Sequence, residues 1–145
     1  MRMNIIKIDD NHWTTEYIPI SYKNILSENH KKNSLTFYWS KEYILYALCR
    51  AYFIDDYIIE IGDVWLNEKL RGKKIKDEKI SVIFMRRVIR KIWKIYEKAK
   101  IINLIVDKNN ISAIKLYNKL DFFISNFDNL LKLNNGIVMS KLKIE

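Results

Sequence analysis

The second half of the chain carries the pattern that most restricts its fold. Apolar residues recur there at steps of three and four, which predicts a helix from Ile75 to Ala99. They are Ile80, Ile83, Phe84, Val88, Ile92, Ile95 and Ala99. The β-rich segment from Tyr57 to Leu66 comes before this helix, and the continuous apolar run from Ile101 to Val106 follows it. Such a short run fits a strand buried on both faces. The pattern therefore predicts a parallel strand-helix-strand unit with a right-handed crossover.

The rest of the chain predicts an antiparallel sheet with a few more helices. Aromatic and β-branched residues separated by polar turns indicate strands, and a polar stretch containing the single proline indicates a broken helix. The expected elements are a strand over Asn4 to Ile8, a helix over Thr14 to Asn29 broken near Pro19, strands over Leu35 to Trp39 and Tyr43 to Ile54, a helix over Asn110 to Leu120, and a closing hairpin with arms Phe122 to Leu133 and Ile137 to Ile144.

Length and composition indicate a folded protein with one core. A chain of 145 residues, 49% hydrophobic and 30% charged, suits a single domain spanning 1–145. No apolar run approaches the roughly 20 residues that cross a membrane, and the first residues lack a secretory cleavage pattern, so we expect a cytoplasmic protein without a membrane partner. With one cysteine and two histidines, we expect no metal site, and Cys49 is predicted to be a buried thiol.

The net charge of +9 is unevenly distributed. Residues 1–68 hold seven basic and ten acidic side chains, whereas residues 69–145 hold nineteen and seven. This asymmetry suggests an anionic partner for the second half and a cationic one for the first. Two simpler explanations compete. Codon composition can enrich lysine, and charges along one helix face are usually just solvated. Nucleic-acid binding is a lesser alternative, because no known binding module is recognisable.

Two segments flanking the predicted long helix suggest a cofactor site. The first is Arg71-Gly72-Lys73-Lys74-Ile75-Lys76, placed where a strand leads into the helix. The first turn of a helix offers backbone N–H groups and a positive dipole end to a pyrophosphate. The alternative for this segment is a solvated basic helix start without a ligand. The second segment contains Asn110, Ala113, Leu116, Tyr117, Leu120 and Phe122.

Together these segments resemble the two signatures of the GNAT superfamily of N-acetyltransferases. The first resembles the turn that grips the pyrophosphate of acetyl-coenzyme A, although Lys74 and Lys76 stand where that superfamily has small residues. In the second segment, Asp121 replaces the expected glycine, a tolerable change because aspartate accepts left-handed backbone angles. The resemblance implies an α/β (α+β) GNAT-like domain, with a central mixed, mostly antiparallel twisted sheet of six to seven strands and about four helices.

The resemblance also implies roles for single residues. Asn110 and Ala113 are expected near the cofactor arm or the helix entry, Tyr117 is expected to protonate the departing thiolate, and the backbone near Leu66 is expected to stabilise the oxyanion. An alternative for Tyr117 is a core aromatic residue. The predicted general base is Glu60, with Asp63 second. Plain strand alternation places Glu60, Gly62, Val64 and Leu66 on one face and Asp63 and Trp65 on the other, unless a bulge changes the parity.

The resemblance thus implies acetyl transfer from acetyl-coenzyme A, as a co-substrate, to a primary amine by direct attack in a ternary complex. The acceptor is a small molecule or a peptide, and the protein is a monomer or a homodimer. Acidic residues of the first half, among them Glu60 and Asp63, favour a cationic acceptor. The alternative is an impaired GNAT-fold protein in which Lys74 and Lys76 spoil the phosphate turn and the basic half binds an acidic partner or nucleic acid.

Overall fold

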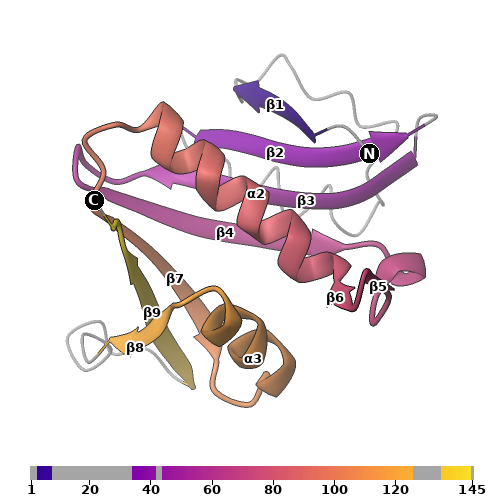
Figure 1. The fold of residues 1–145 in the computed structure, drawn as a ribbon. Helices are drawn as coiled ribbons and strands as arrows, with labels where there is room; N and C mark the ends of the chain where they lie inside the picture. The colour runs from indigo at the N-terminus through magenta and orange to yellow at the C-terminus, as the bar shows by residue number, and fades with distance from the viewer. Residues whose placement is uncertain (1–2, 8–33, 42–43, 126–134, 145) are drawn as a thin grey trace.

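A seven-stranded mixed sheet forms the centre of the molecule in our computed structural model, which describes residues 3–7, 34–41, 44–125 and 135–144. The strand order is β1-β2-β3-β4-β7-β9-β8 (Figure 1). The strands are β1 (Met3–Lys7), β2 (Ser34–Lys41), β3 (Ile44–Phe53), β4 (Ile58–Leu66), β7 (Ile101–Asp107), β8 (Phe123–Ser125) and β9 (Gly136–Leu142). A separate small hairpin consists of β5 (Lys74–Ile75) and β6 (Glu78–Lys79). The described helices are η2 (Glu68–Leu70, a 3₁₀ helix), α2 (Ile80–Ile95) and α3 (Ile111–Lys119).

The connections between the strands confirm the predicted parallel strand-helix-strand unit. Strands β1 to β4 form an antiparallel meander, whereas β4 and β7 pair in parallel. Helix α2 connects those two parallel strands, as a strand-helix-strand unit requires. The structure therefore has the α+β architecture with the mixed, mostly antiparallel sheet that the sequence predicted.

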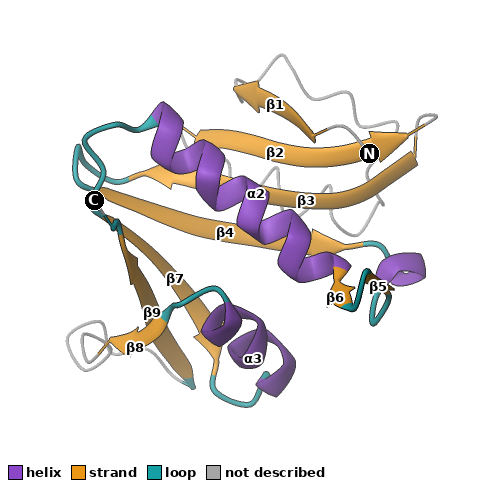
Figure 2. Cartoon of the chain, in the orientation of Figure 1, coloured by secondary structure: helices purple, strands orange, loops and turns teal. Residues whose placement is uncertain are grey.

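Helix α2 packs on the face of the sheet formed by β2, β3 and β4 (Figure 2). Its buried residues are Ile80, Val82, Phe84, Met85, Val88, Ile89 and Ile92, which follow helical spacing. Trp39 of β2 lies edge-on against Phe84, with ring centroids 4.9 Å apart. Trp39 pairs with Ala47 of β3, so these two side chains lie on the same face of the sheet. Because side chains alternate along a strand, Cys49 lies on that face too, and this is the face that α2 covers.

Two predictions about helices need correction. The long helix begins at Ile80 rather than Ile75, because residues 74–79 fold into the β5–β6 hairpin. Its turn residues, Lys76 and Asp77, both have positive φ, a conformation that excludes them from a right-handed helix. The described residues contain two α-helices and one 3₁₀ helix, fewer than the expected four. The helix predicted over residues 14–29 and residues 126–133 of the closing hairpin lie outside the described residues.

Backbone details near α3 follow the sequence closely. Asp121, which stands in place of an expected glycine, has φ +66° and ends α3 in the left-handed conformation. Its N–H donates to Asn118 O, and the next N–H donates to Tyr117 O, which closes the helix end. The parts of the closing hairpin that are described, β8 and β9, pair antiparallel as predicted. None of the described helices is long and apolar enough to cross a membrane.

Candidate active site

The parallel strands β4 and β7 separate halfway along their length. Their pairing runs from Ile58 opposite Ile101 to Ile61 opposite Leu104 and ends there. Strand β4 nevertheless continues to Leu66, and β7 continues to Asp107 (Figure 1). Beyond Ile61, the edge of β4 that faces β7 is not part of a ladder between these strands. Its backbone polar groups can therefore bind a ligand between the two strands.

A basic pocket lies at the start of α2, lined by residues of the β5–β6 hairpin, α2 and α3. Helix α2 has no side-chain cap at Lys79, and the N–H of Ile80 donates to Lys73 O, so the N–H groups of the first turn after Ile80 lack a capping side chain. A pocket of about 290 Å³ adjoins this turn, and its lining includes four basic side chains and two acidic ones. The lining residues are Lys74, Asp77, Glu78, Lys79, Val82, Arg86 and Lys119. Arg86 forms an ion pair with Glu78, which anchors the hairpin against the helix. The pocket thus combines a helix dipole with a net positive charge.

The predicted phosphate turn does not lie directly at the helix start. Arg71 follows the 3₁₀ helix and donates from Nε to the carbonyl oxygen of Leu66, at 3.1 Å. Gly72 has φ +72°, and Lys73 O accepts a hydrogen bond from Ile80 N at 3.0 Å. The predicted placement of Arg71 to Lys76 directly at a strand-to-helix junction was therefore wrong, because the short β5–β6 hairpin precedes the helix. Of that stretch, only Lys74 is among the pocket-lining residues.

Helix α3 presents the second predicted group of residues. Asn110 is its N-cap and accepts a hydrogen bond from Ala113 N at 3.1 Å, so it shapes the helix entry. Tyr117 is buried in the core and lies edge-on against Phe122, with ring centroids 5.7 Å apart. Burial raises the pKa of the Tyr117 hydroxyl, with a smaller contribution from Cys49. A tyrosine hydroxyl carries its proton at neutral pH even without this shift, and the raised pKa makes that of Tyr117 a weaker acid than an exposed one.

A bulge in β4 alters the face on which its acidic side chains lie. Leu48 pairs with Trp65, but Arg50 pairs with Gly62, so Asp63 and Val64 together lie opposite Cys49. Asp63 has φ +53°. Its carboxylate reaches Tyr52, which pairs with Glu60, so Asp63 and Glu60 share a face. The plain alternation that separated these residues was wrong, and the bulge is the reason.

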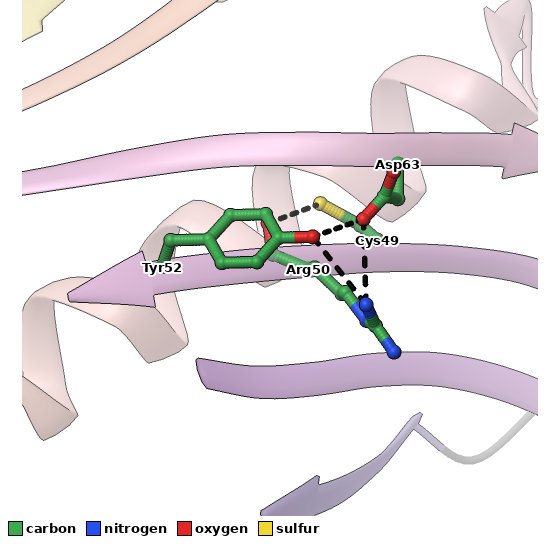
Figure 3. A network of polar contacts seen from close by, with 4 residues as sticks. All are labelled: Cys49, Arg50, Tyr52 and Asp63. Carbon is green, nitrogen blue, oxygen red and sulfur yellow. Dashed lines mark hydrogen bonds and ion pairs between the residues drawn. The ribbon is translucent and has the colours of Figure 1, made fainter. Parts of the chain in front are cut away.

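Three polar side chains converge at this bulge (Figure 3). The hydroxyl of Tyr52 donates to Asp63 Oδ2, and Arg50 Nη1 donates to the Tyr52 oxygen at 3.4 Å. Arg50 Nη1 also lies 3.7 Å from Asp63 Oδ2, and the Arg50 side chain is fully buried. Burial raises the pKa of Tyr52 to about 12. Arg50 and Tyr52 lie on the opposite face of β3 from Cys49, and therefore on the side of the sheet away from α2.

Cys49 is buried, as predicted from the apolar run around it. Burial raises the pKa of its thiol, and the Asp63 carboxylate raises it further. A protonated, fully buried thiol is a poor nucleophile. Among the residues that the structure describes, no group of three or more histidine, cysteine, aspartate or glutamate side chains could hold a metal ion.

The sequence interpretation missed Arg50, Tyr52 and the basic groups Lys79, Arg86 and Lys119. One signal for Arg50 was present, because it is the single charged residue within the apolar run from Tyr43 to Ile54. A charge buried in such a run usually has a partner. The signal for the pocket was weaker, since a solvated basic helix face gives the same pattern.

Comparison with solved structures relates this arrangement to known enzymes. The N-acetyltransferase PseH of Campylobacter jejuni, in complex with acetyl coenzyme A, is 16% identical with TM-score 0.63, and the match covers 84% of this chain and 77% of PseH. The PaiA N-acetyltransferase of Thermoplasma acidophilum, in complex with coenzyme A, is 14% identical with TM-score 0.66, covering 99% and 100%. A variant of the spermidine N-acetyltransferase SpeG of Vibrio cholerae is 17% identical with TM-score 0.62, covering 84% and 73%.

These similarities establish a common fold. The search of family models found no match, and the search of curated protein sequences found none either. The chain has the fold of the GNAT superfamily of N-acetyltransferases.

Proposed function

We propose that this GNAT-fold chain transfers an acetyl group from acetyl-coenzyme A to a primary amine. The observation that carries the proposal is the separation of β4 from β7 beyond Ile61, together with a basic pocket at the first turn of α2, the helix that connects these strands. Several structures with the same fold contain acetyl-coenzyme A or coenzyme A. An extended ligand with a phosphate end and a thioester end suits this combination of a positive pocket and an open strand edge.

The pyrophosphate is proposed to bind at the first turn of α2. Lys74 supplies charge from the predicted stretch, Lys79 supplies it from the N-cap of α2, and Lys119 supplies it from α3. Arg71, Gly72, Lys73, Ile75 and Lys76 remain predicted neighbours of the cofactor in the loop and hairpin that lead to this turn. Asn110 and Ala113 border the cofactor arm at the entry to α3, and the backbone near Leu66 provides the oxyanion donor.

The reaction is a direct transfer between two bound substrates. Glu60 takes a proton from the acceptor ammonium, and the neutral amine attacks the thioester carbonyl. The new C–N bond forms as the C–S bond breaks, and Tyr117 gives its proton to the thiolate. The amide nitrogen releases its second proton to solvent, and Tyr117 regains a proton from solvent. Asp63 is the second candidate for the base. Because no covalent intermediate with the protein is formed, both substrates must be bound at once.

An acetyl-transfer assay with a panel of amines tests this function. The panel contains spermidine, glucosamine, an aminoglycoside, a peptide with a free N-terminal amine and glucosamine 6-phosphate. We expect acetylation of cationic acceptors in preference to the phosphorylated one, and a weaker preference at higher salt, because screening shortens the reach of the carboxylates. A chain that binds acetyl-coenzyme A but acetylates none of these amines would support the non-catalytic alternative.

A further inference from the structure

A row of polar side chains crosses the sheet next to the point where β4 and β7 separate. Glu60 pairs with Tyr52 of β3 on one side and with Asn103 of β7 on the other. Asn103 in turn pairs with Ser140 of β9. Because directly paired residues of neighbouring strands point to the same face, these four side chains lie on the face opposite α2. Glu60, the predicted base, therefore has a polar neighbour on each side.

Asn103 is held in one orientation from the β9 side. Ser140 Oγ donates a hydrogen bond to Asn103 Oδ1 at 2.6 Å, and Ser140 is only 4% exposed. The oxygen and the nitrogen of an amide point in different directions from the carbon that bears them. With Oδ1 turned toward β9, Nδ2 is turned away from β9, to the side on which β4 and Glu60 lie.

The carboxylate of Glu60 has no donor from the other neighbouring strand. The hydroxyl of Tyr52 carries one proton, and this proton goes to Asp63 Oδ2. Among the residues that the structure describes, neither the Glu60 carboxylate nor Asn103 Nδ2 forms a hydrogen bond. Neighbouring strands lie about 4.8 Å apart, a distance that glutamate and asparagine side chains can bridge. An unused donor and an unused acceptor therefore lie side by side.

The charged groups around this row are directed elsewhere. Arg50 Nη1 of β3 lies 3.7 Å from Asp63 Oδ2 of the bulge. Lys141 of β9 alternates with Ser140, so it lies on the α2 face, where its Nζ donates to Leu120 O at 2.8 Å. Over the described part of the chain, no cation forms an ion pair with Glu60. An uncharged amide is thus the neighbour that can hold this carboxylate.

We propose that Asn103 is a positioning residue for the reaction. Its amide nitrogen donates to the Glu60 carboxylate, and Ser140 fixes the direction of that amide. The proposal rests on the acetyl transfer proposed above, with Glu60 as the base. A hydrogen bond from an amide favours the charged form of a carboxylate, so the base stays ionised to lower pH. It also aims the carboxylate, and proton transfer requires hydrogen-bond distance between base and amine.

The pH dependence of kcat in Asn103→Leu and Ser140→Ala tests this proposal, with acetyl-coenzyme A and the best amine of the panel both saturating. In Asn103→Leu, kcat should fall about tenfold, with both KM values within about twofold of the wild type. The acidic limb of the profile should move to higher pH by about half a unit to one unit. Ser140→Ala should shift the limb in the same direction and lower kcat about threefold. In a Glu60→Gln background, Asn103→Leu should cause no further loss, because it acts through that carboxylate.

Ser125→Ala is the matched control. Ser125 is a buried serine on the same face of the sheet, opposite Val138 of β9, and within the described residues its hydroxyl has no hydrogen-bond partner. Its removal should leave kcat and the pH profile unchanged. Thermal unfolding of each variant verifies that it is folded, and Ser140→Ala decides the question if Asn103→Leu does not fold.

Three results would overturn the proposal while the acetyltransferase function stands. They are an unchanged kcat profile in Asn103→Leu, a lower kcat with the acidic limb unmoved, and a further loss when Asn103→Leu is added to Glu60→Gln. The second result would make Asn103 a structural residue only. A wild-type chain that acetylates no amine would overturn the proposed function as well.

Discussion

The two faces of the candidate site use different chemistry. On the α2 face, the proposed cofactor site consists of backbone groups at a helix start and exposed lysines around a pocket. On the opposite face lie the candidate bases Glu60 and Asp63, and the Asp63 carboxylate is hydrogen-bonded to Tyr52 and ion-paired with Arg50 of the neighbouring strand. The first kind of site tolerates changes of side chain, because backbone N–H groups survive substitution. The second kind depends on each side chain, and it is the face that can distinguish one acceptor from another.

The largest effect that separates these faces is expected at Tyr117. Tyr117→Phe removes one oxygen and leaves the packing against Phe122, so the fold should survive. Loss of a positioned proton donor should lower kcat about 100-fold, with little change in either KM. Tyr57→Phe is the control, because Tyr57 is 60% exposed and lies just before the start of β4. Full activity of Tyr117→Phe would mean that this tyrosine is a core residue only.

A second, smaller effect is expected from closing the space beside Tyr52. In Gly62→Ala, the added Cβ would lie 3.0 Å from Tyr52 Cε2, so the ring must shift. Overpacking of this kind should lower the free energy of unfolding by about 1–2 kcal/mol and move Tyr52 from Asp63. We expect the KM of the amine to rise about fivefold at a constant KM of acetyl-coenzyme A. Equal changes of both KM values would show that the two faces are not separate.

The pocket at α2 should show a weaker dependence on any one side chain. Lys79→Ala and Lys119→Ala each remove one exposed charge from the pocket lining, which should weaken acetyl-coenzyme A binding about two- to fivefold. Added salt should reduce the difference. Lys94→Ala removes an exposed charge from the last turn of the same helix and serves as the control. Equal affinities of Lys79→Ala and Lys94→Ala for the cofactor would argue against phosphate binding at the helix start.

The smallest effect concerns stability at alkaline pH. Burial raises the pKa of Tyr52 to about 12, from 10 in the unfolded chain. Because the folded state keeps its proton longer, the stabilisation is fully present below pH 10 and is lost as the pH rises toward 12. In Tyr52→Phe, the free energy of unfolding should therefore fall less steeply with rising alkaline pH than in the wild type. Denaturant titrations at several pH values would measure this difference. The same steepness in both proteins would contradict the burial of this hydroxyl.

Much of the fold was predictable because the apolar pattern is local. The periodic positions start at Ile80, and the true start of α2 agrees with that residue better than with the predicted Ile75. The hairpin between them was missed because its turn places Lys76, a residue with no special preference for positive φ, in the left-handed region. Asp121 at φ +66° was anticipated, since a glycine was expected there and aspartate is one of its common substitutes.

The acceptor side was predictable only in part, because it depends on how two strands pair. Glu60 and Asp63 could be identified as acidic residues of β4, but their shared face follows from the register shift opposite Cys49. The register between two strands is decided by packing between segments that are distant in the sequence. The alternation of side chains within one strand carries no information about it. Arg50 was visible in the sequence as a charge within an apolar run, yet its partners, Tyr52 and Asp63, required the structure.

Calorimetric titration of the chain with acetyl-coenzyme A tests the central claim most directly. The proposed function predicts saturable binding of one cofactor per chain, with an affinity that Lys79→Ala weakens and that Asp63→Asn leaves unchanged. That combination would place the cofactor on the α2 face and keep the carboxylate network for the acceptor. Absence of binding at millimolar cofactor would contradict the acetyltransferase assignment.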